Sequence, residues 1–84
     1  MKVQPELEQA LKRAPSADVA VIVHVQGDPT QYSDAIEALG LTIVRAFRLT
    51  NTLAVRGAAF RVSLLADYAW VTRIEADRQI TTQR

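Results

Sequence analysis

Few residues of this 84-residue chain could carry out covalent chemistry. The chain has no cysteine and a single histidine, His24, so it cannot form a disulfide, a thiolate metal site or a zinc site built from several histidines. Hydrolysis needs a nucleophile, a base and a group that orients the base. The candidates for these roles are Ser16, Ser33, Ser63 and His24. Because His24 stands in the middle of an expected strand, we interpret it as a half-exposed polar residue and predict a protein that is no enzyme and uses no cofactor or metal.

Two carboxylates near the end of the chain point to binding. Glu75 and Asp77 alternate with Ile74 and Ala76, so in a strand both carboxylates project from the same face. On an open sheet face, such a carboxylate can accept hydrogen bonds from the exposed N–H groups at the start of a partner's helix. This pattern favours a contact with another protein.

The segment Val25-Gln26-Gly27 resembles the phosphate loop of acylphosphatases and would imply an enzyme. Such a loop holds phosphate with free backbone N–H groups and an arginine. Here Asp28 adds a repelling charge and Pro29 removes a donor. These two residues favour a helix start instead, with Asp28 as N-cap and Pro29 in the first turn.

Composition and charge set the class of protein. Apolar residues make up 49% and charged residues 23%, which is typical of one folded domain, and the net charge of +1 gives no basic field for nucleic acid or an anionic membrane. The first 14 residues are polar, and the longest apolar run, residues 19–25, contains His24 and is too short to span a bilayer. We expect a soluble cytoplasmic protein, or a secreted one if it is cut from a precursor.

The spacing of apolar residues predicts the first elements that position these groups. A helix begins near Pro5, carries Leu7 and Leu11 on one face, and ends before Pro15. A strand follows over residues 19–26, with four valines on one face. A second helix runs from Pro29 to Gly40, which suits a left-handed C-cap. Its apolar stripe is Tyr32, Ala35, Ile36 and Leu39.

The second half of the chain predicts two strands, a helix and a last strand. If residues 50–52 form a three-residue loop, Leu49 faces Leu53 and Phe47 faces Val55 on one apolar face. Even spacing then turns Arg45 toward the core, so we expect a bulge or a snorkelling side chain there. The helix, from about residue 59, should bury Phe60, Leu64, Leu65 and Tyr68, and the last strand opens with Val71 and Ile74.

The predicted order after the first helix is β-α-β-β-α-β, an α+β, ferredoxin-like sandwich with two helices on one face of a four-stranded antiparallel sheet. Residues 1–17 form the N-terminal helix and link, residues 18–77 the domain, and residues 78–84 an extended tail. The predicted core is Val19, Val21, Val23, Val25, Ile36, Leu39, Phe47, Leu53, Leu64 and Leu65. The other sheet face is left bare and unusually apolar, which marks a contact site. Its predicted residues are Ala20, Ile22, His24, Val44, Ala46, Ala54, Arg56, Arg73 and Glu75.

Over residues 19–77 the chain resembles the propeptides and propeptide-like inhibitors of subtilisin-type serine proteases. The most specific segment is the ending, Val71-Thr72-Arg73-Ile74-Glu75-Ala76-Asp77, because the family closes with a valine, two variable residues, Val or Ile, and Glu-x-Asp. The opening strand, residues 38–43 and the hairpin over residues 47–55 also fit. Thr52 and Ala69 depart from the family pattern, which commonly has a small residue and a proline there.

The resemblance implies that the bare face packs on the protease and that Glu75 and Asp77 cap two of its helices. The implied contact residues are Ile22, His24, Ala46, Arg73, Glu75 and Asp77. The implied tail in the substrate cleft is Ile80, Thr81, Thr82, Gln83 and Arg84. Since the chain starts with Met1 and carries no catalytic domain, we expect a stand-alone inhibitor or folding chaperone of a subtilisin-like serine protease, monomeric when free, that binds no nucleic acid and no membrane.

A second hypothesis is a ferredoxin-like regulatory module that binds a ligand or forms a dimer through its bare face or a sheet edge. The tail distinguishes the two, because an inhibitor needs its last residues and a dimerising module does not.

Overall fold

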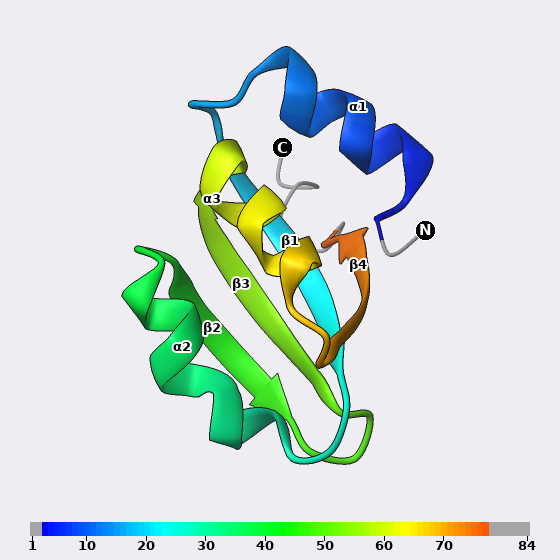
Figure 1. Ribbon diagram of the computed structural model, residues 1–84, viewed down its shortest axis with the longest axis vertical. Helices are drawn as coiled ribbons and strands as arrows, with labels where there is room; N and C mark the ends of the chain where they lie inside the picture. Colours follow the sequence, from blue (N-terminus) through cyan, green and yellow to red (C-terminus); the bar gives the residue numbers. More distant parts are fainter. Residues whose placement is uncertain (1–2, 78–84) are drawn as a thin grey trace.

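A four-stranded antiparallel sheet with helices on one face forms the described part of the chain, residues 3–77 of the computed structural model (Figure 1). Along the chain the elements are α1 (Pro5–Arg13), β1 (Asp18–Val25), the 3-10 helix η1 (Pro29–Tyr32), α2 (Ser33–Ala38), β2 (Thr42–Phe47), β3 (Thr52–Ala58), α3 (Ala59–Leu64), the 3-10 helix η2 (Leu65–Asp67) and β4 (Val71–Ala76). The strand order is β2-β3-β1-β4, and every neighbouring pair is antiparallel. This is the predicted ferredoxin-like arrangement.

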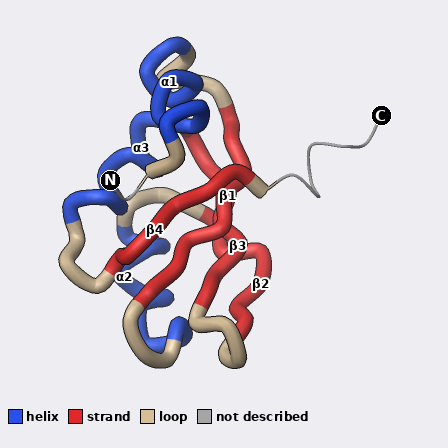
Figure 2. Tube along the Cα trace, turned by 90° about the vertical axis from the view of Figure 1, so that its right-hand side faces the viewer, coloured by secondary structure: helices blue, strands red, loops and turns tan. Residues whose placement is uncertain are grey.

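The helices and the sheet form two layers. Figure 2 shows the helices together on one side of the strands, and no described helix lies on the other side. Because side chains alternate along a strand, each strand sends half of them into the helical layer and half toward the uncovered face. Within residues 3–77, the sheet face opposite the helices is therefore uncovered.

The core lies between the two layers. Val21, Val23 and Val25 of β1 are buried as predicted, and Leu53 and Val55 of β3 pack beside them. Val19 and Leu39 are only partly buried against this cluster. The remaining buried apolar residues of the cluster are Leu7, Leu11, Ile36, Leu41, Ala59, Val62, Leu65, Val71 and Ile74.

The hairpin between β2 and β3 differs from the predicted one. Phe47 pairs with Thr52, so the loop has four residues, and Leu49 lies in it fully exposed. Phe47 itself is 38% exposed, so its assignment to the core was wrong. Asn51, the last residue of this four-residue loop, has a positive φ of 55°, a conformation that asparagine tolerates better than most residues.

The expected bulge near Arg45 is confirmed. The pairing of β2 with β3 shifts register between Ile43 and Arg45, which leaves Val44 as the extra residue. One extra residue turns every later side chain of the strand to the opposite face. Arg45 is thereby exposed, and Ala46 moves to the core side.

The helix α3 buries a different stripe from the one predicted. Phe60 and Leu64 are 48% and 43% exposed, whereas Ala59, Val62 and Leu65 are buried. The helix begins directly after β3, and the small side chain of Ala59 lets its first turn lie against the sheet. The buried positions then follow Ala59 at spacings of three, and Phe60 and Leu64 face outward.

The N-terminal segment covers the outer edge of β4. Val3 forms a parallel bridge with Ile74, and the amide of Gln4 donates to the Ile74 carbonyl at 3.2 Å. The side-chain oxygen of Gln4 accepts from the amide of Ala76 at 3.1 Å. Residues before α1 thus close one edge of the sheet.

Candidate functional site

Three rows of side chains cross the uncovered sheet face. Each row holds four residues, one for each strand of the sheet. From β2 to β4 the rows are Phe47-Thr52-His24-Arg73, then Arg45-Ala54-Ile22-Glu75, then Thr42-Arg56-Ala20-Asp77. Asp77 follows the end of β4, but its amide donates to the Ala20 carbonyl at 3.0 Å and continues the pairing. We call these twelve residues the open face.

The middle of the open face carries small apolar side chains. Ala20 and Ala54 are small and only 9% and 5% exposed, so larger neighbours rise around them. Ile22 stands half-buried beside Ala54, and Phe47 is exposed at the β2 side. Small central side chains allow the backbone of a partner to approach the sheet closely.

The β4 side of the open face carries a charged cluster. His24 Nε2 lies 2.5 Å from Glu75 Oε2, and Arg73 Nε lies 3.8 Å from the same oxygen. The side chains of His24 and Glu75 are about one third exposed, so the carboxylate remains open to a partner. The sequence did not predict this pair, because it depends on the register between β1 and β4.

The β2 and β3 strands contribute two arginines to the open face, Arg45 and Arg56. Arg56 is tied to Asp18 by an ion pair of 2.8 Å, which offsets its charge. Arg45 forms no ion pair or hydrogen bond through its side chain within residues 3–77. Among residues 3–77, therefore, the β2 side of the face carries an arginine with no ion pair, and the β4 side carries the Glu75 carboxylate.

The structure places most of the predicted contact residues together. Ile22, His24, Arg73 and Glu75 lie on the open face as expected. Asp77 lies in the row of Ala20 but is only 7% exposed. The predicted tail, Ile80 to Arg84, lies outside the described residues.

The prediction that Ala46 lies on the open face was wrong, whereas Val44 is 48% exposed and does not pack against the core. Ala46 pairs with Leu53 and packs against the core, and Val44 is the bulge residue. The same register shift brings Arg45 and Phe47 onto the open face, where the sequence did not place them. The signal was Arg45 itself, because simple alternation would have buried its charge.

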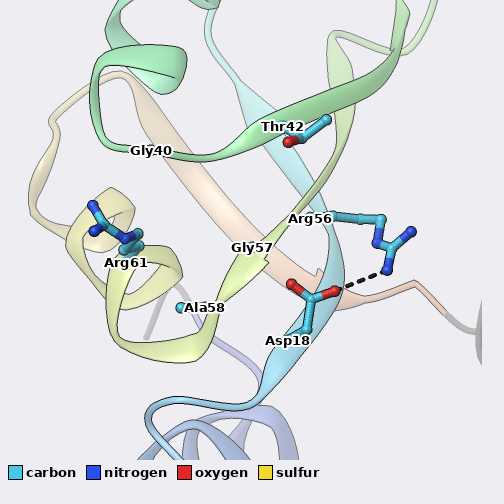
Figure 3. Close-up of a pocket in the computed structure, with 7 residues that line it drawn as sticks. All are labelled: Asp18, Gly40, Thr42, Arg56, Gly57, Ala58 and Arg61. Carbon is cyan, nitrogen blue, oxygen red and sulfur yellow. Dashed lines mark hydrogen bonds and ion pairs between the residues drawn. The ribbon is translucent and has the colours of Figure 1, made fainter.

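A pocket of about 460 Å³ opens where β2 and β3 diverge, next to the open face (Figure 3). In Figure 3 the backbone at Gly40 and Thr42 forms one wall and the backbone at Gly57 and Ala58 the other. Both arginines at the pocket are already bonded, since Arg61 donates to the Leu39 carbonyl and Arg56 to Asp18, each at 2.8 Å. Asp18, the carboxylate of the pocket lining, is held in this ion pair with Arg56.

No hydrogen bond within residues 3–77 links a serine to His24, and no group of three or more potential ligands in that range could hold a metal ion.

Asp28 caps η1 as predicted, because its carboxylate accepts from the Thr30 amide at 3.0 Å. This bond, the Thr30 hydroxyl and nearby Arg48 hold the pKa of Asp28 below its ordinary value. Between residues 3 and 77 no helix combines the length and apolar character needed to cross a bilayer.

Comparison with known proteins adds no family to this description. No protein family matches the chain, and no curated protein sequence matches it.

Proposed function

We propose that this chain is a propeptide-like inhibitor of a subtilisin-type serine protease. The open face packs on the protease surface, and the C-terminal residues occupy the substrate cleft. The observation that carries the proposal is the open face itself, a sheet surface with small apolar side chains in its middle, a half-buried isoleucine beside them and a carboxylate at its rim. The resemblance of residues 71–77 to the ending of such inhibitors supports the same partner.

The open face suits a partner surface that presents the N-terminal ends of helices and small side chains. Ile22 supplies apolar surface beside the small central side chains, and Glu75 offers carboxylate oxygens to N–H donors of the partner. His24 holds one of these oxygens in place from β1. The carboxylate is therefore oriented before the partner arrives, which lowers the entropy cost of binding.

An inhibition panel tests the proposal. The wild-type chain should inhibit at least one subtilisin-like protease and leave a trypsin-like protease unaffected. Ile22→Asp should abolish inhibition because it places an uncompensated charge in the middle of the interface. Leu64→Asp is the matched control, since Leu64 is exposed on the helical side, and it should inhibit like wild type. Equal inhibition by both variants would refute docking through the open face.

Glu75→Gln tests the carboxylate. If Glu75 accepts charge-assisted bonds from helix N–H groups, the variant should bind the protease more weakly by about 1 to 3 kcal/mol. Glu75→Gln keeps the size of the side chain, so circular dichroism should show an unchanged fold. An unchanged inhibition constant would remove Glu75 from the contact.

Deletion of residues 81–84 tests the tail. An extended chain binds a protease cleft by backbone pairing and pockets for alternate side chains. The shortened protein should keep its thermal midpoint and lose most of its inhibition. Light scattering on the wild-type protein provides the contrast: a stable dimer that inhibits no protease would favour the dimerising regulatory module.

A further inference from the structure

We propose that the β2 hairpin forms a second contact with the same protease and recognises an acidic, apolar strip beside the main docking surface. This inference rests on the proposed function. The contact consists of five side chains, Val44, Arg45, Phe47, Arg48 and Leu49, which we call the hairpin arm.

Exposed apolar surface is concentrated in the hairpin arm. Five large apolar side chains are strongly exposed among residues 3–77, and three of them belong to the arm: Val44 at 48%, Phe47 at 38% and Leu49 at 101%. The side chain of Leu49 is fully in solvent, so it adds nothing to the packing of the core. Apolar side chains gathered in one exposed place mark contact sites more often than scattered ones do.

The charge of the hairpin arm is positive, and the counter-charge that it has among residues 3–77 is Asp28 beside Arg48. The sequence contains no acidic residue between Glu37 and Asp67. The side chain of Arg45 has no ion pair within the described residues, and Arg48 is 73% exposed with its Nε 3.9 Å from Asp28. A surface that carries carboxylates fits two such arginines best.

The hairpin arm is continuous with the open face. Arg45 lies in the row of Ile22, and Phe47 lies in the row of His24. β2 is the last strand on its side of the sheet, so no described strand separates the arm from solvent. A protease seated over Ile22 and Glu75 would therefore reach the arm across about 14 Å, three strand spacings.

The arm suits an acidic partner better than a second copy of this chain. Two copies joined through their arms would bring Arg45 and Arg48 of one copy close to the same arginines of the other. Like charges placed together disfavour that pairing. The protease surface next to the docking site should instead carry Asp or Glu among apolar side chains.

The double variant Arg45→Glu/Leu49→Ser tests the arm. Its control is Arg13→Glu/Leu64→Ser, which makes the same chemical changes at an exposed arginine of α1 and an exposed leucine of α3. Against a subtilisin-like protease that the wild type inhibits, the arm variant should raise the inhibition constant by about tenfold or more, mainly through a slower association rate. The inhibition constant of the wild type should rise with salt, and that of the arm variant should depend on salt much less.

Three results would overturn the inference. The arm and control variants could inhibit equally well while the wild type still inhibits, which would leave the proposed function intact. Light scattering could show a wild-type dimer that the arm variant loses without any change in inhibition, which would assign the arm to self-association. The wild type could inhibit no subtilisin-like protease, in which case both proposals fail. Unchanged thermal midpoints of both variants establish that the comparison is made between folded proteins.

Discussion

Leu64 and Leu65 are neighbours in sequence with opposite surroundings. Leu65 is fully buried, whereas Leu64 is 43% exposed. Leu65→Ala should lower the free energy of unfolding by about 2 to 5 kcal/mol because it opens a cavity in the core. Leu64→Ala should lower it by less than about 1 kcal/mol. Urea denaturation of both variants measures the difference, and equal losses would show that α3 faces the other way.

Asp28 should make folding sensitive to acid. Its folded-state pKa is held below the ordinary value, first by the Thr30 amide, so the contribution to stability is complete above about pH 4 and is lost as pH falls through the folded-state pKa. Asp28→Ala removes the cap and should be less stable than wild type at neutral pH. The stability difference should shrink as pH falls below about 4. A constant difference across that range, measured by thermal unfolding, would contradict the cap.

The turn between α2 and β2 depends on Gly40. Its φ is 85°, and a Cβ at this position would lie 2.6 Å from Arg61 Nη1, the atom that donates to Leu39. Gly40→Ala should therefore destabilise the protein by about 1 to 2 kcal/mol from the backbone alone, with a further loss from the contact with Arg61. In an Arg61→Ala background only the backbone part should remain. The same loss in both backgrounds would show that the contact costs nothing.

Strong alternation made the elements predictable where one face is uniformly apolar. The four valines of β1 fix its inner face, and Pro5, Pro15, Gly27 and Gly40 fix the ends of the neighbouring elements. β2 has no such face, because Ile43, Val44, Ala46 and Phe47 place apolar side chains at both odd and even positions. Which side chains of β2 point toward the core depends on the bulge at Val44. A bulge is set by pairing with β3 rather than by local sequence.

The dependence on strand pairing also limited how much of the candidate site could be predicted from the sequence. Ile22 and Glu75 lie on strands with clear alternation, and the sequence placed both on the open face. The contact between His24 and Glu75 required the register between β1 and β4, which a single sequence does not encode locally. The stripe of α3 was misassigned because Phe60 and Leu64 are as apolar as Val62 and Leu65, so periodicity alone could not separate the two faces.

At the scale of the whole molecule, α1 contributes to the core rather than to the open face. Leu7 and Leu11 are buried, and α1 lies beside α3 on the helical side (Figure 1). A variant that begins at Pro15 should lose at least about 2 kcal/mol of unfolding free energy with the two buried leucines. At temperatures where it stays folded, it should inhibit the protease like wild type. A large loss of inhibition in a folded variant would assign α1 to the interface.

The closed edge of β4 limits how copies of this protein can join. A sheet extends into a fibril only when both outer strands accept a new strand, because each added molecule must offer a free edge to the next. The Val3 bridge and the Gln4 contacts occupy the β4 edge. If two copies pair through their β2 strands, the pair therefore offers no free β4 edge to a third copy. The short segment before α1 therefore occupies the backbone groups of Ile74 and Ala76 to which an added strand would have to pair.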